Sequence, residues 1–400
     1  MPFFQRAVHS SIPNDPPKHL HWGYFLTFFV LGLVPAALGP TLITLAQQTG
    51  SELKDVSILF SMRSLGYLCS ARIIGGLYDK RAGHPIMVIA LSAAVVLMFT
   101  IPYITSLGVL SGAFLLHGIL SAFIDLGGNI LLIWAFHKNT GPYLNGLHFS
   151  FGVGAFTAPL LVAFTLSIEQ PPVYTYWIIG LLSLPCILWL SRTPSPQNPF
   201  PQEEEKLSAE ETPVSIWLLV AFFFLYGGSE VSLGGWIHTY GIKHNLMEPA
   251  KAAYLTSSFW GAFTLGRLFA IRLASKFAAI KLILLQLSGA ALFMLLLFSV
   301  PANESITWVC TIVTGLCMSS VFPMALTYFK KFTAGSGQLT SWFWIGASSG
   351  SMILPWTIGQ FFEKIGPEFF AITIFVCITS ATLIMAYISR PRPQLSTANE

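Results

Sequence analysis

The sequence predicts an all-α membrane protein in which twelve transmembrane helices form two pseudo-symmetric six-helix bundles. Three observations lead to this fold class. Only 10% of the 400 residues are charged and 54% are hydrophobic, whereas about a quarter of the residues in a soluble domain are charged. The chain contains about twelve apolar stretches long enough to cross a bilayer. The last six stretches repeat residue spacings found in the first six.

The apolar stretches are separated by charged and turn-forming residues. Each has about 17 residues or more, which is sufficient for the hydrocarbon core of a membrane. A soluble protein of this composition could not cover its surface with polar groups, so we expect a multi-pass protein in the lipid bilayer of the cell (inner or plasma) membrane. The expected spans are 22–47, 56–78, 84–103, 106–136, 142–168, 173–191, 213–241, 250–273, 279–300, 304–329, 336–362 and 368–389.

A polar segment rich in proline and glutamate separates the sixth and seventh stretches. Such a composition is typical of a solvated linker. We therefore expect an N-terminal six-helix bundle at 22–191, a cytoplasmic linker at 192–212 and a C-terminal six-helix bundle at 213–390. Residues 1–21 and 391–400 are expected to be cytoplasmic tails.

The two bundles repeat each other at a nearly constant offset. Gly32 and Gly39 in the first stretch match Gly227 and Gly234 in the seventh, 195 residues later. Gly66 and Arg72 match Gly261 and Arg267 at the same offset, and Gly154 and Pro159 match Gly350 and Pro355 at an offset of 196. Two parallel repeats with a site between them are typical of a rocking transporter.

The distribution of basic residues predicts the orientation. With both termini in the cytoplasm, fourteen Lys and Arg residues lie on cytoplasmic segments and four lie outside, namely Lys54, Lys243, Lys251 and Lys364. This bias agrees with the positive-inside rule. No basic strip with interleaved aromatic residues is present, so nucleic acid is not an expected partner.

The loop Gly75–Pro85, GGLYDKRAGHP, is a candidate gate. Asp79 could cap or bridge a neighbouring helix end, while Lys80 and Arg81 remain in water. Charge contacts of this kind can hold one conformation and break in another. An ordinary charged turn is the alternative interpretation. Arg63, within the second stretch, could neutralise a buried acid, snorkel outward or take part in gating.

Asp125 is an ionisable residue deep in the fourth stretch. Gly118, Ser121, Asp125 and Asn129 share one helical face. Because a charge inside a membrane is costly, Asp125 marks a candidate site for substrate or for a coupling ion. Asn129, one turn away, is a candidate substrate ligand. A buried acid paired with an arginine for packing alone is the alternative.

Glu230 interrupts the seventh stretch in YGGSEVSLGGWIHTY, Tyr226–Tyr240. It shares a face with Gly227, Gly234 and His238, and Trp236 lies beside that face. Glycines leave room for a ligand or a neighbouring helix, and an aromatic ring beside hydrogen-bonding groups suits the face of a sugar. Glu230 is therefore a candidate for substrate binding and ion coupling, and Trp236 and His238 are candidate substrate ligands.

The fifth and eleventh stretches present matching faces of small, polar and aromatic residues. His148 lies in LNGLHFSFGVGAFTAP, and its counterpart 196 residues later is Trp344. Both are candidate substrate ligands. A histidine bonded to a backbone carbonyl is the alternative for His148.

Several of these strings resemble one branch of a known transporter superfamily. The loop at Gly75–Pro85 resembles the cytoplasmic signature of the major facilitator superfamily, with Lys80 in place of the usual Arg and one extra residue, Ala82. The strings RSLGY, DLGGN, HFSFGVGAFTAP, YGGSEVSLGGW and FWGAFTLGRL resemble the sodium-dependent glucose transporter group, which is similar to fucose permeases.

The resemblance implies the major facilitator fold and places two residues by position. Asp125 and Asn129 match the acid and the amide of the fucose permeases' fourth helix, where the acid takes part in proton-linked sugar transport. Glu230 falls where those permeases carry a polar substrate-binding residue. Their acid on the first helix is absent here, since 22–48 contains no Asp or Glu. Sodium coupling, a one-acid scheme and facilitated diffusion therefore all stay open.

Taken together, the sequence predicts a monomeric secondary transporter that moves a hexose-like solute by alternating access with Na⁺ or H⁺. The same fold could carry a drug, a nucleoside or an organic anion, and a non-transporting scaffold or sensor is a remote alternative. The sequence contains no metal cluster, nucleophile–base pair or phosphate loop, so neither enzymatic activity nor a cofactor is expected.

Overall fold

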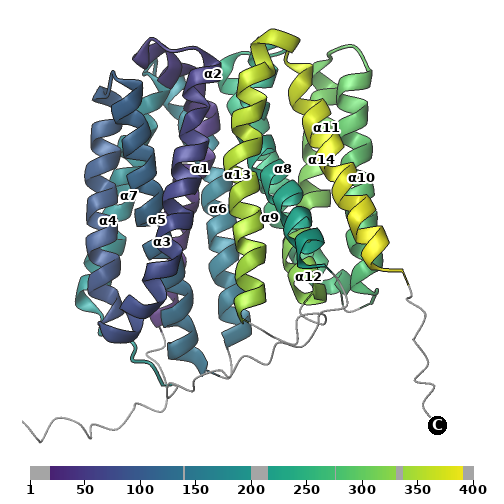
Figure 1. The fold of residues 1–400 in the computed structure, drawn as a ribbon. Coiled ribbons are helices and arrows are strands. Elements are labelled where there is room, and N and C mark those ends of the chain that lie inside the picture. The colour runs from purple at the N-terminus through teal and green to yellow at the C-terminus, as the bar shows by residue number, and fades with distance from the viewer. Residues whose placement is uncertain (1–18, 138–139, 200–214, 275, 330–336, 391–400) are drawn as a thin grey trace, which may run out of the picture.

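The computed structural model describes residues 19–137, 140–199, 215–274, 276–329 and 337–390 (Figure 1). In these ranges the chain forms helices and connecting loops, with no strand. The predicted C-terminal tail, the part of the predicted linker at 200–212 and the part of the predicted N-terminal tail at 1–18 lie outside the described residues.

The helices stand side by side as rods (Figure 1). The N-terminal half consists of α1 (Leu20–Thr49), the short α2 (Leu53–Val56), α3 (Ile58–Lys80), α4 (Gly83–Thr100), α5 (Leu107–Phe136), α6 (Thr140–Ser167) and α7 (Thr175–Arg192). The C-terminal half consists of α8 (Ile216–Lys243), α9 (Pro249–Ala274), α10 (Ala279–Ser299), α11 (Glu304–Met318), α12 (Val321–Phe329), α13 (Gly337–Ile365) and α14 (Glu368–Ile388).

The rods have the lengths that a membrane requires. Within the described ranges, nine spans are long and apolar enough to cross a bilayer, with α11 and α12 counted as one. The other three rods, α3, α9 and α13, have 23, 26 and 29 residues, so they are long enough but more polar. The predicted all-α fold is confirmed, and these three more polar helices border the cavity described below.

The packing of the two halves is equivalent. In the first half α1 packs on α6, α3 on α5, and α4 on α7; in the second, α8 packs on α13, α9 on α11, and α10 on α14. The match extends to single atoms. A Cβ at Gly154 would collide with the carbonyl oxygen of Phe29, and one at Gly350 would collide with that of Phe224. Phe29 and Phe224 are 195 positions apart, and the two glycines are 196 apart.

The span expected at 304–329 is not one continuous helix. It breaks between α11 and α12 at Ser319 and Ser320. The carbonyl of Met318 accepts a hydrogen bond from the Tyr226 hydroxyl, and that of Ser319 accepts one from Arg267 Nε at 3.1 Å. These bonds satisfy backbone groups at the break, which is what allows irregular backbone at membrane depth.

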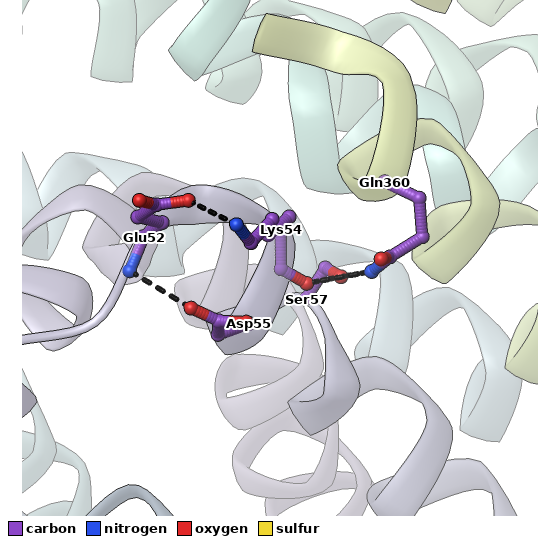
Figure 2. A network of polar contacts seen from close by, with 5 residues as sticks. All are labelled: Glu52, Lys54, Asp55, Ser57 and Gln360. Carbon is purple, nitrogen blue, oxygen red and sulfur yellow. Dashed lines mark hydrogen bonds and ion pairs between the residues drawn. The ribbon is translucent and has the colours of Figure 1, made fainter. Parts of the chain in front are cut away.

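The two ends of the bundle differ. We call the end where α1 begins and α14 ends the terminal face, and the end that carries α2 the distal face (Figure 1). At the distal face Gln360 Nε2, on α13, donates to the carbonyl of Lys54 at 2.7 Å and lies 3.4 Å from Ser57 Oγ (Figure 2). The Lys54 ammonium, 2.6 Å from Glu52, donates a hydrogen bond that lowers the pKa of the Glu52 carboxyl.

Other contacts between the halves also lie in the distal parts of the helices. Ser61 Oγ donates to the carbonyl of Met352 at 2.7 Å, and Ser257 Oγ donates to that of Phe156 at 2.7 Å. Farther toward the distal face, Val162 and Ala163 of α6 form a small apolar cluster with Ala253 of α9. The halves are therefore fastened together on the distal side.

The close approach of α1 and α6 makes a prediction about stability. Replacing Gly154 with alanine places a methyl group against the Phe29 carbonyl, and overpacking of this kind costs about 1–3 kcal/mol. We expect Gly154→Ala to lower the midpoint of thermal unfolding in detergent.

Gly112→Ala is the matched control, because a Cβ at Gly112 of α5 meets no atom within 4 Å. This change removes a helical glycine without crowding, so it should be neutral or stabilising. Equal unfolding midpoints for the two variants would contradict the packing described here.

Candidate functional site

A cavity lies between the two halves. It has two adjoining parts of about 160 and 270 Å³. Both parts are bordered by Arg63, Tyr67, Asp125, Glu230 and Val231. The first three belong to the N-terminal half and the last two to α8. Two carboxylates predicted from separate stretches of the sequence therefore border one space from opposite sides.

Asp125 is held by two donors. The Tyr67 hydroxyl of α3 donates to Asp125 Oδ2 at 2.7 Å, and Asn129 Nδ2 donates to Asp125 Oδ1 at 3.0 Å. Asn129 Nδ2 also lies 2.9 Å from the backbone carbonyl of Asp125. Each carboxylate oxygen thus accepts one bond and keeps capacity for another. Asn129 orients Asp125 and is not among the residues that border the cavity.

Glu230 is surrounded differently. It lies at the cavity one turn from Gly227 and one from Gly234, which also border it. Arg267 of α9 and Tyr226 act on its carboxylate, and both residues also bond carbonyls at the break between α11 and α12. The Arg267 guanidinium carbon lies 4.6 Å from the centre of the Phe263 ring. Because Arg267 is already held by these contacts, it provides a fixed positive charge beside Glu230.

Arg63 lies in the cavity rather than in a peripheral gate. It borders both parts of the cavity, and electrostatic interactions link it to Tyr67 and Tyr176. Its Nε is buried and has no hydrogen-bond acceptor among the described residues. The cavity is therefore lined by two arginines and two carboxylates, one of each from either half.

Trp236 and His238 lie outside the residues that border the cavity. Trp236 is fully buried, its Nε1 donates to the carbonyl of Pro355 at 3.0 Å, and its ring stacks on Phe362. His238 is buried, with Nε2 3.2 Å from the carbonyl of Pro249. Both side chains pack the distal part of α8 against its neighbours.

The two candidates from α6 and α13 are placed differently from each other. Trp344 borders the larger part of the cavity and is 47% exposed. His148 is exposed in the terminal part of α6, with its ring edge-on to Phe28 at a centroid distance of 6.0 Å. Arg267 acts on it electrostatically. His148 is therefore near the site without bordering the cavity.

The candidate gating residues lie at the terminal face. Gly75 lies in α3, near its end. Asp79, Lys80 and Arg81 are exposed at the end of α3, where Asp79 Oδ1 accepts a hydrogen bond from Asn198 Nδ2 at 3.4 Å. This bond joins the loop to the segment after α7. It does not join the two halves.

Tyr67 and Trp260 are among the cavity residues that sequence reasoning did not single out. Tyr67 follows Arg63 by one helical turn, and Trp260 precedes Arg267 by two. Each shares a helical face with an arginine inside a membrane span, and this spacing is the signal that could have found them. Among the described residues, no group of three or more His, Cys, Asp or Glu side chains is arranged to hold a metal ion.

Comparisons with known proteins agree with this architecture. The model of the Major Facilitator Superfamily matches residues 22–355. The chain is 30% identical over 377 residues to "Sodium-dependent glucose transporter 1" of Xenopus laevis, covering 87% of this chain and 76% of that protein.

Solved structures show the same fold at low sequence identity. A D-xylose–proton symporter superposes with a TM-score of 0.75 at 11% identity, covering 93% of this chain and 97% of the other. The nucleoside transporter NupG gives 0.71 at 14% identity, covering 93% and 99%. With a family model matched over most of its length, and with the paired bundles around a central cavity, this chain belongs to the Major Facilitator Superfamily of membrane transporters.

Proposed function

We propose that this transporter moves a small hydroxylated solute by alternating access coupled to Na⁺ or H⁺, with a hexose as the first candidate. The observation that carries the proposal is the cavity itself. It combines carboxylates, guanidinium groups, hydroxyls and aromatic rings from both halves, and a polyol needs acceptors, donors and an apolar face together.

The relatives support the class of solute. The Xenopus laevis relative bears the name of a sodium-dependent glucose transporter, and the chain covers 76% of it. The solved structures are named for a pentose and for nucleosides, but at 11% and 14% identity they support the fold alone. A nucleoside also combines hydroxyls with a ring, so it is the second solute class to test.

The contacts between the halves support alternating access. Hydrogen bonds from Gln360, Ser61 and Ser257 fasten the distal side. Trp344 and His148 lie in the terminal parts of α13 and α6, and both are exposed. This arrangement is what one end state of a rocking transporter requires. With both termini in the cytoplasm, as the basic residues favour, it is the inward-facing state.

Asp125 and Glu230 are proposed to have different roles, one in binding the cation and the other in binding the solute. Asp125 has a carboxylate oriented by Tyr67 and Asn129, so it can accept a proton or a sodium ion without rearrangement. Glu230 borders the same space opposite it, beside the charge of Arg267. In this scheme the cation neutralises one acid and the solute hydroxyls bond the other.

Counterflow tests the cargo. Proteoliposomes loaded with unlabelled sugar should take up labelled D-glucose, D-galactose, L-fucose or D-mannose with saturable kinetics. The cavity is chiral, so excess L-glucose should not compete with D-glucose. Uridine, tested in the same vesicles, examines the nucleoside alternative. A lack of saturable exchange for every sugar would reject the hexose proposal.

Coupling is tested by Asp125→Asn, which keeps the size of the side chain and removes its charge. We expect the variant to lose uphill accumulation, whether a sodium or a proton gradient drives the wild type, and to retain exchange at equal concentrations. This expectation assigns the cation to Asp125 and the solute hydroxyls to Glu230, so the variant lacks the carboxylate through which the gradient acts.

Glu169→Gln is the control, because it removes an exposed carboxylate at the end of α6 away from the cavity. It should accumulate solute as the wild type does. If Asp125→Asn also accumulates normally, Asp125 is not the coupling residue.

A further inference from the structure

Two residues that border the cavity each carry a buried hydrogen-bond donor without an acceptor. Among the described side chains that have a buried polar atom lacking a partner, only Arg63 and Trp260 border the cavity. The atoms concerned are Arg63 Nε and Trp260 Nε1. Trp260 is 9% exposed. Each N–H can only donate, so only an acceptor atom can satisfy it.

The donors come from opposite halves. Arg63 lies on α3 and Trp260 on α9, the two helices that occupy equivalent places in the repeat. A buried donor without an acceptor is costly and calls for an explanation. Seven other buried side-chain atoms among the described residues also lack a hydrogen-bond partner, but none of their residues borders the cavity. Other tryptophans in this chain show the usual outcome, since Trp236 Nε1 bonds the Pro355 carbonyl and Trp177 Nε1 bonds the Phe99 carbonyl at 3.1 Å.

The neighbours of Trp260 fix its indole ring over α8. Phe259 and Phe263 meet the ring edge-on, with centroid distances of 4.9 and 5.7 Å. A Cβ at Gly234 would lie 2.5 Å from Trp260 Cζ2 and 3.1 Å from Nε1. The glycine one turn after Glu230 therefore makes room for this ring, and the indole nitrogen lies against the helix that carries the acid.

We propose that Trp260 Nε1 and Arg63 donate hydrogen bonds to acceptor oxygens of the transported solute. This inference rests on the proposed function and assigns residues to it. Asp125 and Glu230 supply acceptors on either side, so the cavity offers both donors and acceptors to a neutral polyol. An apolar drug would leave these donors without an acceptor.

The assignment has a mechanical consequence. A solute bonded to Arg63 and Trp260 joins α3 to α9 across the two halves. Binding then draws the halves together at the cavity. The hydrogen bonds of Gln360, Ser61 and Ser257 join the halves only on the distal side. The hydroxyl or ring oxygen that meets Trp260 becomes a determinant of specificity.

The test measures binding of D-glucose to purified protein in nanodiscs. Trp260→Phe keeps an aromatic ring and removes the N–H, so affinity should fall about three- to tenfold. Arg63→Met keeps an apolar stem and removes a charged donor, so the loss should be about tenfold or more. Trp177→Phe is the matched control, since its N–H bonds a backbone carbonyl away from the cavity, and its affinity should equal that of the wild type.

Deoxyglucose analogues identify the sugar oxygen that accepts the hydrogen bond from Trp260. The wild type should lose affinity for one deoxyglucose whose missing oxygen meets Trp260, and Trp260→Phe should bind that analogue as well as it binds D-glucose. The corresponding deoxyfluoroglucose, which accepts but does not donate, should retain part of the wild-type affinity. The thermal midpoint of each variant without sugar shows that the fold is retained.

The outcomes separate the two proposals. Wild-type affinity in Trp260→Phe and in Arg63→Met overturns this inference and leaves the proposed function standing. The inference is also overturned if each deoxyglucose loses the same affinity, relative to D-glucose, in the wild type and in Trp260→Phe. In that case no sugar oxygen accepts a hydrogen bond from Trp260. Failure of the wild type to bind any hexose overturns the proposed function, and this inference with it.

Discussion

The high cost of charge inside a membrane determines where the chemistry of this protein can lie. Asp125, Glu230, Arg63 and Arg267 all lie within membrane-spanning helices, more than one turn from either end, and a charge facing lipid there would be unfavourable. The fold solves this by turning all four toward the space between its halves, where they border one cavity. Equal numbers of acids and arginines keep the formal charge of that space balanced.

The duplicated scaffold and the unduplicated site have different physical origins. Close helix contacts recur in both halves because each needs the same packing, as the collisions avoided at Gly154 and Gly350 show. The chemistry does not recur. Position 35 in α1, which corresponds to Glu230, is a proline, and both residues border the smaller part of the cavity. The acid is therefore an addition to one half of the repeated scaffold.

Much of the fold could be predicted from the sequence, because hydrophobic length and glycine spacing are local properties. The membrane spans and the repeat follow from them, while the cost of a charge inside a membrane marked Asp125 and Glu230 as candidates. The break at Ser319 and Ser320 could not be predicted, since it depends on Tyr226 and Arg267, which bond the freed carbonyls from other helices.

The sequence also could not show how far the cavity extends along α8. Helical periodicity places Gly227, Glu230, Gly234 and His238 on one face, but it does not show where a neighbour covers that face. The cavity reaches Gly234, and one turn later His238 is buried beside Pro249. Trp236 has a side chain of the type that packs against sugars, yet its indole N–H donates a hydrogen bond to the carbonyl of Pro355. Trp260, which does border the cavity, lies on a different helix.

The central claim is that the two halves rock about this cavity. It is tested most directly by pulsed spin-label distances in a cysteine-free background. One label pair, at Glu52 and Glu363, reports on the distal face, and another, at Arg81 and Lys276, reports on the terminal face. On adding D-glucose with a sodium or proton gradient, the two distances should change in opposite directions, the first lengthening as the second shortens. Distances that stay fixed, or that lengthen together, would contradict the account.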